Sequence, residues 1–393
     1  MSTRWLAGVA VCGAIALAAL LKPSPETLAL EYQSGTEPHP AVGGLGGRTL
    51  DTSADRPAGL ALPDLQSTSP LFARWTSPRV PGGLLWLALD AAQEAGVYDR
   101  LYIDANGNGR LDDDAAIEAL SARDAFSYFT PVPVSWRENG RAVTYHLNFI
   151  LTRAEGRPRL AVRSSGWFAG AVTVRGKEKE CALIDQNANA TFNDRSIDLE
   201  NADMIQIVEP GVQDVALVGE FVEVDARLYR LEVPREGGRA ILTPAKGVRF
   251  GKVQQPTDMV ELIAGGENGM FTVKLRKGAG KLPAGRYRIY QWTQQRKDSY
   301  DNEWAIIGHS QGNPDVFEIA AGRPVRPDLG EPITSRMEVQ AQEERQYVLR
   351  HAWHGRAGES VRITCNGASP PPAQVHIRNA DGSYDRIFTF EHG

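Results

Sequence analysis

The chain of 393 residues has few of the features that most often reveal a function. It contains 3 cysteines, of which only Cys181 and Cys365 lie beyond the N-terminal segment. Two cysteines cannot build the disulfide framework of a small secreted domain, and they leave open one long-range bridge or two independent buried thiols. His351 and His354 in "HAWH" have no third ligand at a zinc-binding spacing.

A strong charge of one sign is also missing. The formal net charge is −5, which argues against a nucleic-acid-binding protein because such a protein usually has a basic face. The charge is too small to indicate disorder, and 42% hydrophobic residues is ordinary for a folded protein. A chain of this length can form two or three domains, each with its own core.

Helical periodicity is scarce, and the best short candidate for a helix is "DDAAIEALSARDAF" at residues 113–126. Short runs with alternating apolar and polar residues are frequent instead, as in "AVTYHLNFIL" at 142–151. Turn signals separate these runs, and Asp381-Gly382 is a strong hairpin signal. The sequence therefore predicts a mainly β protein made of several antiparallel β-sandwich modules with few short helices.

The N-terminus has one long uncharged run, "WLAGVAVCGAIALAALL" at residues 5–21, directly after Arg4. This pattern predicts that residues 1–21 are a signal peptide or a membrane anchor, and therefore that the protein is exported to the periplasm, the cell surface or the medium. Residues 22–66 are rich in Pro, Gly, Ser and Thr without any period, which predicts a flexible linker.

Three ordered parts are expected after the linker. Residues 67–212 carry two Asx-rich loops, 213–328 form a second β-sandwich module, and 329–393 form a small C-terminal β module. In the second part, "LPAGRYRI" at 282–289 resembles a turn and strand of the prealbumin-like and carboxypeptidase-regulatory-like sandwiches. That resemblance covers about a dozen residues and implies a structural or binding module.

The most specific signal is the segment "RLYIDANGNGRLDDD" at residues 100–114. Oxygen-bearing groups recur at alternate positions, a glycine stands where the chain must turn, and an apolar residue follows. This pattern resembles the calcium loop of EF-hand and dockerin proteins, although Ala115 stands where those families place a bidentate carboxylate, so that Asp113, Asp114 or Glu118 would have to substitute for it. The resemblance implies Ca²⁺ as cofactor, held by Asp104, Asn106, Asn108, the Arg110 carbonyl and Asp112.

A second segment, "CALIDQNANATFNDR" at residues 181–195, repeats the same pattern. Asp185, Asn187 and Asn189 are the corresponding metal ligands, while Ala190 replaces the glycine of the first loop. Asn193 stands in the place of Asp112, and Asp194 or Asp198 could replace the carboxylate that is lost there. The repeat indicates an internal duplication. Both loops have an alternative explanation, because Asn and Asp side chains form stable turns with their own backbone in the absence of any metal.

Two other functions compete with calcium binding. "GHSQG" at residues 308–312 matches the nucleophile elbow of α/β-hydrolases with Ser310 as nucleophile, but no helix is predicted after it. Tryptophans are spread over all the modules and could line a glycan site of a carbohydrate-binding module, although such residues more often fill cores.

Taken together, these patterns favour an exported, non-catalytic calcium-binding protein of a bacterial cell envelope, with a structural or interaction role. The expected partner is an envelope protein or a polysaccharide. No nucleic acid is expected, and a membrane is contacted only through the N-terminal segment.

Overall fold

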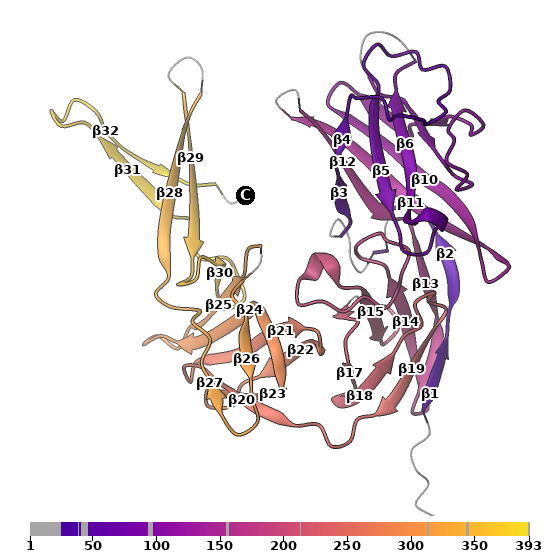
Figure 1. Ribbon diagram of the computed structural model, residues 1–393. Coiled ribbons are helices and arrows are strands. Elements are labelled where there is room, and N and C mark those ends of the chain that lie inside the picture. Colours follow the sequence, from indigo (N-terminus) through magenta and orange to yellow (C-terminus); the bar gives the residue numbers. More distant parts are fainter. Residues whose placement is uncertain are drawn as a thin grey trace, which may run out of the picture.

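The computed structural model describes residues 25–37, 39–40, 46–92, 97–154, 157–212, 214–312, 314–342 and 346–391. The predicted signal peptide or anchor at 1–21 lies outside these residues. The described chain is mainly β and forms several antiparallel sheets, which confirms the predicted fold class (Figure 1). Two short 3-10 turns are present, η1 (Pro81–Gly83) and η2 (Leu199–Asn201). No helix in this part of the chain is long and apolar enough to cross a membrane.

Two five-stranded sheets form the first half of the N-terminal part. Sheet I contains, in spatial order, β4 (Thr52–Ser53), β5 (Leu71–Thr76), β6 (Leu84–Asp90), β7 (Arg100–Ile103) and β8 (Ile117–Glu118). Sheet II contains β3 (Arg48–Leu50), β12 (Arg157–Ser164), β11 (Arg141–Ala154), β10 (Phe126–Glu138) and β9 (Ser121–Arg123).

The second half also has two sheets. Sheet III contains β16 (Ala216–Leu217), β15 (Met204–Val208), β14 (Lys177–Ile184), β13 (Gly166–Val174) and β2 (Glu31–Ser34). Sheet IV contains β1 (Glu26–Ala29), β19 (Arg239–Pro244), β18 (Arg227–Glu232) and β17 (Phe221–Val224).

The two halves follow the same plan. In each, a short N-terminal segment crosses from one sheet to the other, with β3 and β4 joining sheets II and I, and β1 and β2 joining sheets IV and III. In each, the central strand that precedes the Asx-rich loop, β7 or β14, has a neighbour on both sides. The internal duplication indicated by the two loops therefore extends to the sheets that hold them.

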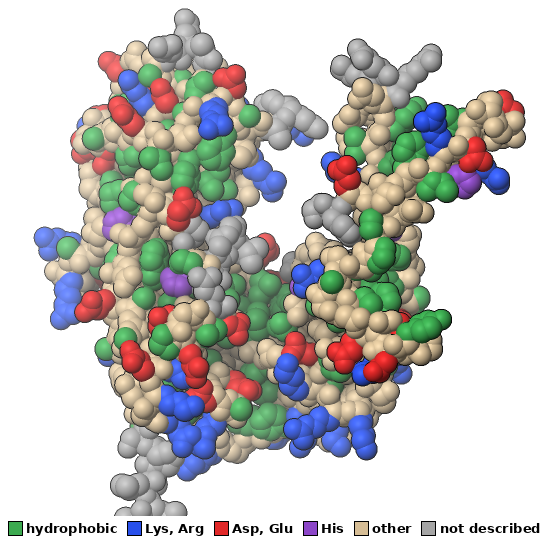
Figure 2. All heavy atoms as spheres, turned by 180° about the vertical axis from the view of Figure 1, so that it is seen from behind, with side chains coloured by type: hydrophobic (Ala, Val, Ile, Leu, Met, Phe, Trp, Pro, Cys, Tyr) green, Lys and Arg blue, Asp and Glu red, His purple; other side chains and the backbone are tan. Residues whose placement is uncertain are grey.

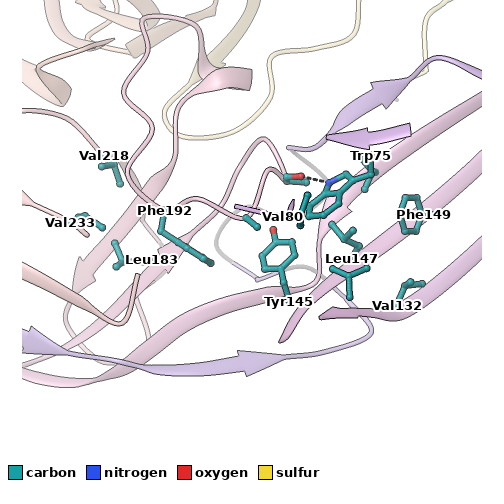
Figure 3. Packing of buried hydrophobic residues seen from close by; sticks show 14 of the residues in the cluster. Trp75, Val80, Val132, Tyr145, Leu147, Phe149, Leu183, Phe192, Val218 and Val233 are labelled. Atoms are coloured by element: carbon teal, nitrogen blue, oxygen red, sulfur yellow. Dashed lines mark hydrogen bonds between the residues drawn. The ribbon is translucent and has the colours of Figure 1, made fainter. Parts of the chain in front are cut away.

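One continuous apolar core joins all four sheets (Figure 3). Alternation along the strands sends every second side chain inward, so that Leu85, Leu87 and Leu89 of β6 face Phe149 and Leu151 of β11 across the sandwich. A smaller apolar cluster lies on the other face of sheet I, where the segment 60–65 covers it. Both faces of sheet I are therefore covered next to the first loop.

The C-terminal part has its own core around Trp292. Sheet V contains β22 (Gly269–Lys274), β21 (Met259–Gly266), β24 (Gly285–Lys297), β25 (Glu303–His309), β30 (Ser360–Cys365), β29 (Tyr347–His354) and β28 (Thr334–Ala341), with β26 (Phe317–Ile319) paired to β24. A smaller sheet contains β23 (Ala279–Pro283), β20 (Phe250–Gln254) and β27 (Pro324–Val325). The last hairpin consists of β31 (Gln374–Arg378) and β32 (Asp385–Thr389).

Several predicted boundaries differ from the structure. The range 22–66, predicted as a linker, supplies β1 to β4, because its isolated apolar residues such as Leu28 and Leu50 are buried by partners far along the chain. The boundary at 212/213 cuts sheets III and IV, which need β16 to β19, and the boundary at 328/329 separates β30 from β25. The helix expected at 113–126 is also replaced by β8 and β9, since pairing with β7 and β10 outweighs local helix propensity.

The cysteines do not pair. Cys181 is buried in the main core and Cys365 ends β30 in the C-terminal part, and both are free thiols. Burial raises the pKa of the Cys181 thiol to about 12, so this side chain acts as a small apolar core residue.

Candidate functional site: the paired Asx-rich loops

The two loops share one hydrogen-bond frame. In the first, the Asp104 carboxylate accepts the backbone N–H groups of Asn108 and Gly109, both at 2.9 Å. In the second, the Asp185 carboxylate accepts those of Asn189 at 3.2 Å and Ala190 at 2.6 Å. Both carboxylates are buried, so each ties the end of a central strand to the loop that follows.

A second pair of contacts is also common to both loops. The amide oxygen of Asn108 accepts the N–H of Arg110 at 2.8 Å, and that of Asn189 accepts the N–H of Thr191 at 2.7 Å. These are the Asx turns that the sequence offers as the alternative to metal binding. The loops are thus ordered by their own side chains in the structure.

In each loop, an aspartate that the sequence offered only as a substitute ligand completes the frame. The Asn108 amide N–H donates to Asp113 at 2.7 Å, and the Asn189 amide N–H donates to Asp194 at 2.6 Å. Asp113 and Asp194 occupy the same place in the two aligned segments, which is the signal that could have identified them. Asp112 and Asn193, which also occupy the same place in the two aligned segments, make no such shared contact.

The backbone explains one difference between the loops. The chain is left-handed at Gly107 and Gly109, with φ of 72° and 79°, and also at Ala188 and Ala190, with φ of 53° and 65°. A left-handed conformation is inexpensive for glycine and costs a residue with a Cβ about 1 kcal/mol. The second loop accepts this cost because both alanine methyl groups are buried in the main core.

The first loop lies near the surface. The Asp112 side chain forms an ion pair with Arg110 at 2.5 Å and lies half-exposed, so this predicted ligand faces a cation of its own chain. The Asn106 amide oxygen accepts the N–H of Asn108 at 3.0 Å. Leu111 is fully buried and anchors the loop to the small cluster on sheet I.

Asp114 is the unusual carboxyl group of this loop. Its Oδ2 atom is buried and receives no hydrogen bond from any residue that the structure describes. Burial and the nearby carboxylates of Asp104 and Asp113 raise the pKa of Asp114 to about 6, although the Ala105 N–H partly offsets them. A bound cation would satisfy this oxygen and remove the repulsion among the three carboxylates.

The second loop is enclosed by the junction between the two halves (Figure 3). The Tyr145 hydroxyl donates to Asp185 at 2.7 Å, the Trp75 indole N–H donates to the Ala188 carbonyl at 2.7 Å, and Arg79 donates to the Ala190 carbonyl at 2.8 Å. The loop therefore connects β5, the segment that follows β5, and β11 of the first half to β14 of the second.

Asp194 already has three hydrogen-bond donors. The Asn187 and Asn189 amides and the Thr191 hydroxyl all donate to its Oδ2 atom, at 3.0, 2.6 and 2.7 Å. Burial raises the pKa of Asp185 to about 6 and that of Asp203, which accepts the N–H groups of Gln186 and Asp194, well above its usual range. Internal donors thus satisfy Asp194 in this loop, whereas the amide oxygens of Gln186 and Asn187 are buried without a donor from the described residues.

The structure therefore groups the predicted ligands differently from the sequence. In the first loop, Asp104 and Asn108 lie beside Asp113 and Asp114, whereas Asp112 pairs with Arg110. In the second loop, the amide groups of Asn187 and Asn189 donate hydrogen bonds to Asp194. Within the described ranges, no group of three or more His, Cys, Asp or Glu side chains has the arrangement of a metal site. A cation in the first loop would depend on amide and backbone oxygens as well as carboxylates.

The hydrolase motif lies at the end of β25. Ser310 donates its hydroxyl to the Ile289 carbonyl at 2.6 Å, and the next element of the described chain is β26, where an elbow needs a helix. Gly308 is required for a different reason, since a Cβ there would meet the Trp292 ring at 2.1 Å. The motif is explained by packing in sheet V, and this geometry gives the hydrolase prediction no support.

The tryptophans are used mainly in packing. Trp75 and Trp292 are fully buried, and Trp136 is 5% exposed. Of the other described tryptophans, Trp86 and Trp167 are half-buried in sheets I and III, and Trp304 and Trp353 are half-buried on different strands of sheet V. Burial of this kind is typical of tryptophans used in packing.

Comparison with known proteins gives no further guidance to function. No family model, no curated protein and no solved structure matches this chain.

Proposed function

We propose that this chain is an exported, non-catalytic calcium-binding protein of the cell envelope, in which residues 104–114 form the cation site. The proposal rests on one observation above the others: Asp114 holds a buried carboxylate oxygen without a donor from the described chain, beside Asp104 and Asp113. A hard divalent cation with oxygen ligands is the chemistry that relieves such a site. Export is supported by the charge pattern of residues 1–21.

In this proposal Asp114 supplies the carboxylate oxygen that has no donor, amide and backbone oxygens of the loop, such as that of Asn108, supply further ligands, and Asp104 and Asp113 lie nearby. Asp112, predicted as a ligand from spacing, stays with Arg110. The site lacks the bidentate carboxylate of a high-affinity loop, because Ala115 stands in its place. We therefore expect a dissociation constant of roughly 10⁻⁴ to 10⁻³ M. Calcium at that affinity would act on stability, by joining the end of β7 to the segment that leads into β8.

The test is thermal unfolding of the full chain at pH 7 in EDTA, in CaCl₂ and in MgCl₂. A calcium concentration tenfold above the dissociation constant adds about 1.4 kcal/mol, which raises the melting temperature by about 3 to 6 °C. Asp114→Asn should abolish the calcium response. It should also melt higher than the wild type in EDTA, because it removes a carboxylate that is desolvated beside two others.

Asp112→Asn is the matched control. It removes a carboxylate from the same loop, but one that pairs with Arg110 and lies outside the proposed ligand set. This variant should keep the full calcium response. A wild-type protein that melts at the same temperature in EDTA and in CaCl₂, or an Asp114→Asn variant that responds like the wild type, would contradict the proposal.

A further inference from the structure

β28 is an unusual edge strand. All eight of its residues are exposed, and it is the longest strand at the edge of any described sheet. It pairs with β29 from Thr334↔His354 to Ala341↔Tyr347 without a register shift. β29 in turn pairs with β30 only at Trp353 and His354, so most of this hairpin projects away from sheet V (Figure 1).

Little of the described chain covers this arm: on its apolar face, the ring centroid of Phe390 lies 5.3 Å from that of His351. An isolated two-stranded hairpin is marginally stable in water, and an unpaired edge offers a row of N–H and C=O groups to another strand. The register divides the side chains of the arm, which consists of β28 and β29, between two faces. One face carries apolar residues, including Met337, Val339 and Tyr347, whose exposed fractions are 51%, 57% and 64% (Figure 2).

The other face carries opposite charges two residues apart. Arg336, Glu338 and Gln340 alternate with the apolar residues along β28, and Glu338 lies opposite Arg350 of β29. The edge strand therefore presents a positive and a negative side chain, two residues apart, to any strand that pairs with it.

We propose that β28 pairs antiparallel with β28 of a second copy of this chain, about a two-fold axis that passes through Met337. This axis, perpendicular to the sheet, keeps the apolar faces of the two arms on the same side. It places Arg336 opposite Glu338 of the second copy, and Glu338 opposite Arg336 of the second copy. Met337 then lies opposite its own equivalent on the apolar face.

The charges select this register from its neighbours. An axis through Arg336 would place two arginines opposite each other, and an axis through Glu338 would do the same with two glutamates. Like charges directly opposite each other are unfavourable, whereas opposite charges stabilise a cross-strand pair. The strand is thus complementary to itself in charge, which a general edge for unrelated partners does not require.

The first experiment is sedimentation equilibrium of the full chain over a wide concentration range. We expect a reversible dimer in the wild type, weakened about tenfold or more by Arg336→Glu and by Glu338→Arg, because each places two like-charged pairs at the interface. The double variant Arg336→Glu/Glu338→Arg restores both opposite-charge pairs and should restore dimerisation. Arg336 and Glu338 both lie on an exposed strand, so their substitution removes no buried contact. Because Glu338 also lies opposite Arg350 of β29, Arg350→Glu accompanies Glu338→Arg in each variant and keeps an opposite-charge pair within the arm.

The second experiment tests the axis directly by oxidation of introduced cysteines. Met337→Cys places two thiols opposite each other, within the Cα separation that a disulfide requires, and should give a covalent dimer. Gln340→Cys places the two thiols six residues apart along the strands, about 20 Å, and should not. A wild-type protein that is monomeric throughout, reversals that leave dimerisation unchanged, or equal cross-linking of both cysteine variants would overturn the proposal.

Discussion

The loops at 104–114 and 185–194 have the same internal hydrogen bonds and different surroundings. The first lies at the surface of sheet I and keeps glycine at both left-handed positions, while Oδ2 of Asp114 has no donor among the described residues. The second lies in the junction between the halves, where Tyr145, Trp75 and Arg79 reach it and where donors surround Asp194.

The difference shows how one duplicated motif can acquire two roles. In a buried setting an unpaired polar group is costly, and most oxygens of the second loop have a donor from the protein, although the amide oxygens of Gln186 and Asn187 have none among the described residues. At the surface the same frame can leave carboxylates for a ligand. The second loop is therefore best understood as a structural connection, and the first as the place where a cation can act.

The largest effect should come from the apolar residue that anchors each loop. Phe192 is fully buried, with its ring centroid 4.9 Å from that of Phe168 and 6.4 Å from that of Tyr145, so Phe192→Ala should cost about 3 to 5 kcal/mol of unfolding free energy. Leu111→Ala, in the smaller cluster, should cost less, about 2 to 3 kcal/mol. Urea denaturation of both variants measures this, and equal losses would show that the two loops are anchored alike.

A smaller effect is expected at the hydroxyl of Tyr145. Tyr145→Phe removes one donor from the buried Asp185 carboxylate and should cost about 1 to 3 kcal/mol at pH 7. The hydroxyl lowers the pKa of Asp185, which burial has raised to about 6, so it stabilises the ionised form. The unfolding free energy that Tyr145→Phe loses should therefore become smaller as the pH falls below 6 and Asp185 becomes protonated in the folded protein.

The measurement is the unfolding free energy of the wild type and of Tyr145→Phe at pH 5 and pH 7. Burial raises the pKa values of Asp114, Asp185 and Asp203 in the folded state, so their unfavourable ionisation destabilises the wild type increasingly as the pH rises through these values. A Tyr145→Phe loss that is the same at both pH values would mean that the hydroxyl contributes through packing and not through the Asp185 charge.

The smallest effect concerns the left-handed positions. Gly109→Ala introduces a Cβ that meets no atom within 4 Å, so its cost of about 1 kcal/mol reflects backbone conformation alone. Ala190→Gly relieves the same strain but removes a fully buried methyl group, so the two terms oppose each other and the net change should be smaller. Thermal melts in EDTA compare Gly109→Ala with Ala190→Gly. A larger decrease in melting temperature for Ala190→Gly would show that the contacts of the methyl group outweigh the backbone strain.

Much of the fold could be predicted from local sequence. Alternation in runs such as 142–151 corresponds to β11, and Asp381-Gly382 lies in the turn between β31 and β32. The shared pattern of the two loops also predicted a duplication, and it placed Asp104 and Asp185 at strand ends. These features depend on residues close in the chain, which is why their pattern is visible without the structure.

The sequence by itself determined most of the strands and turns after residue 66 and the two loops with their Asx contacts. Only the tertiary structure decided which loop is buried, that residues 26–53 enter four sheets, and that Asp113 and Asp194 complete the loops. The physical reason is that burial and pairing depend on partners far along the chain, such as Leu28 beside β19 and Tyr145 beside Asp185. Short segments with weak local preference take the conformation that these distant contacts stabilise.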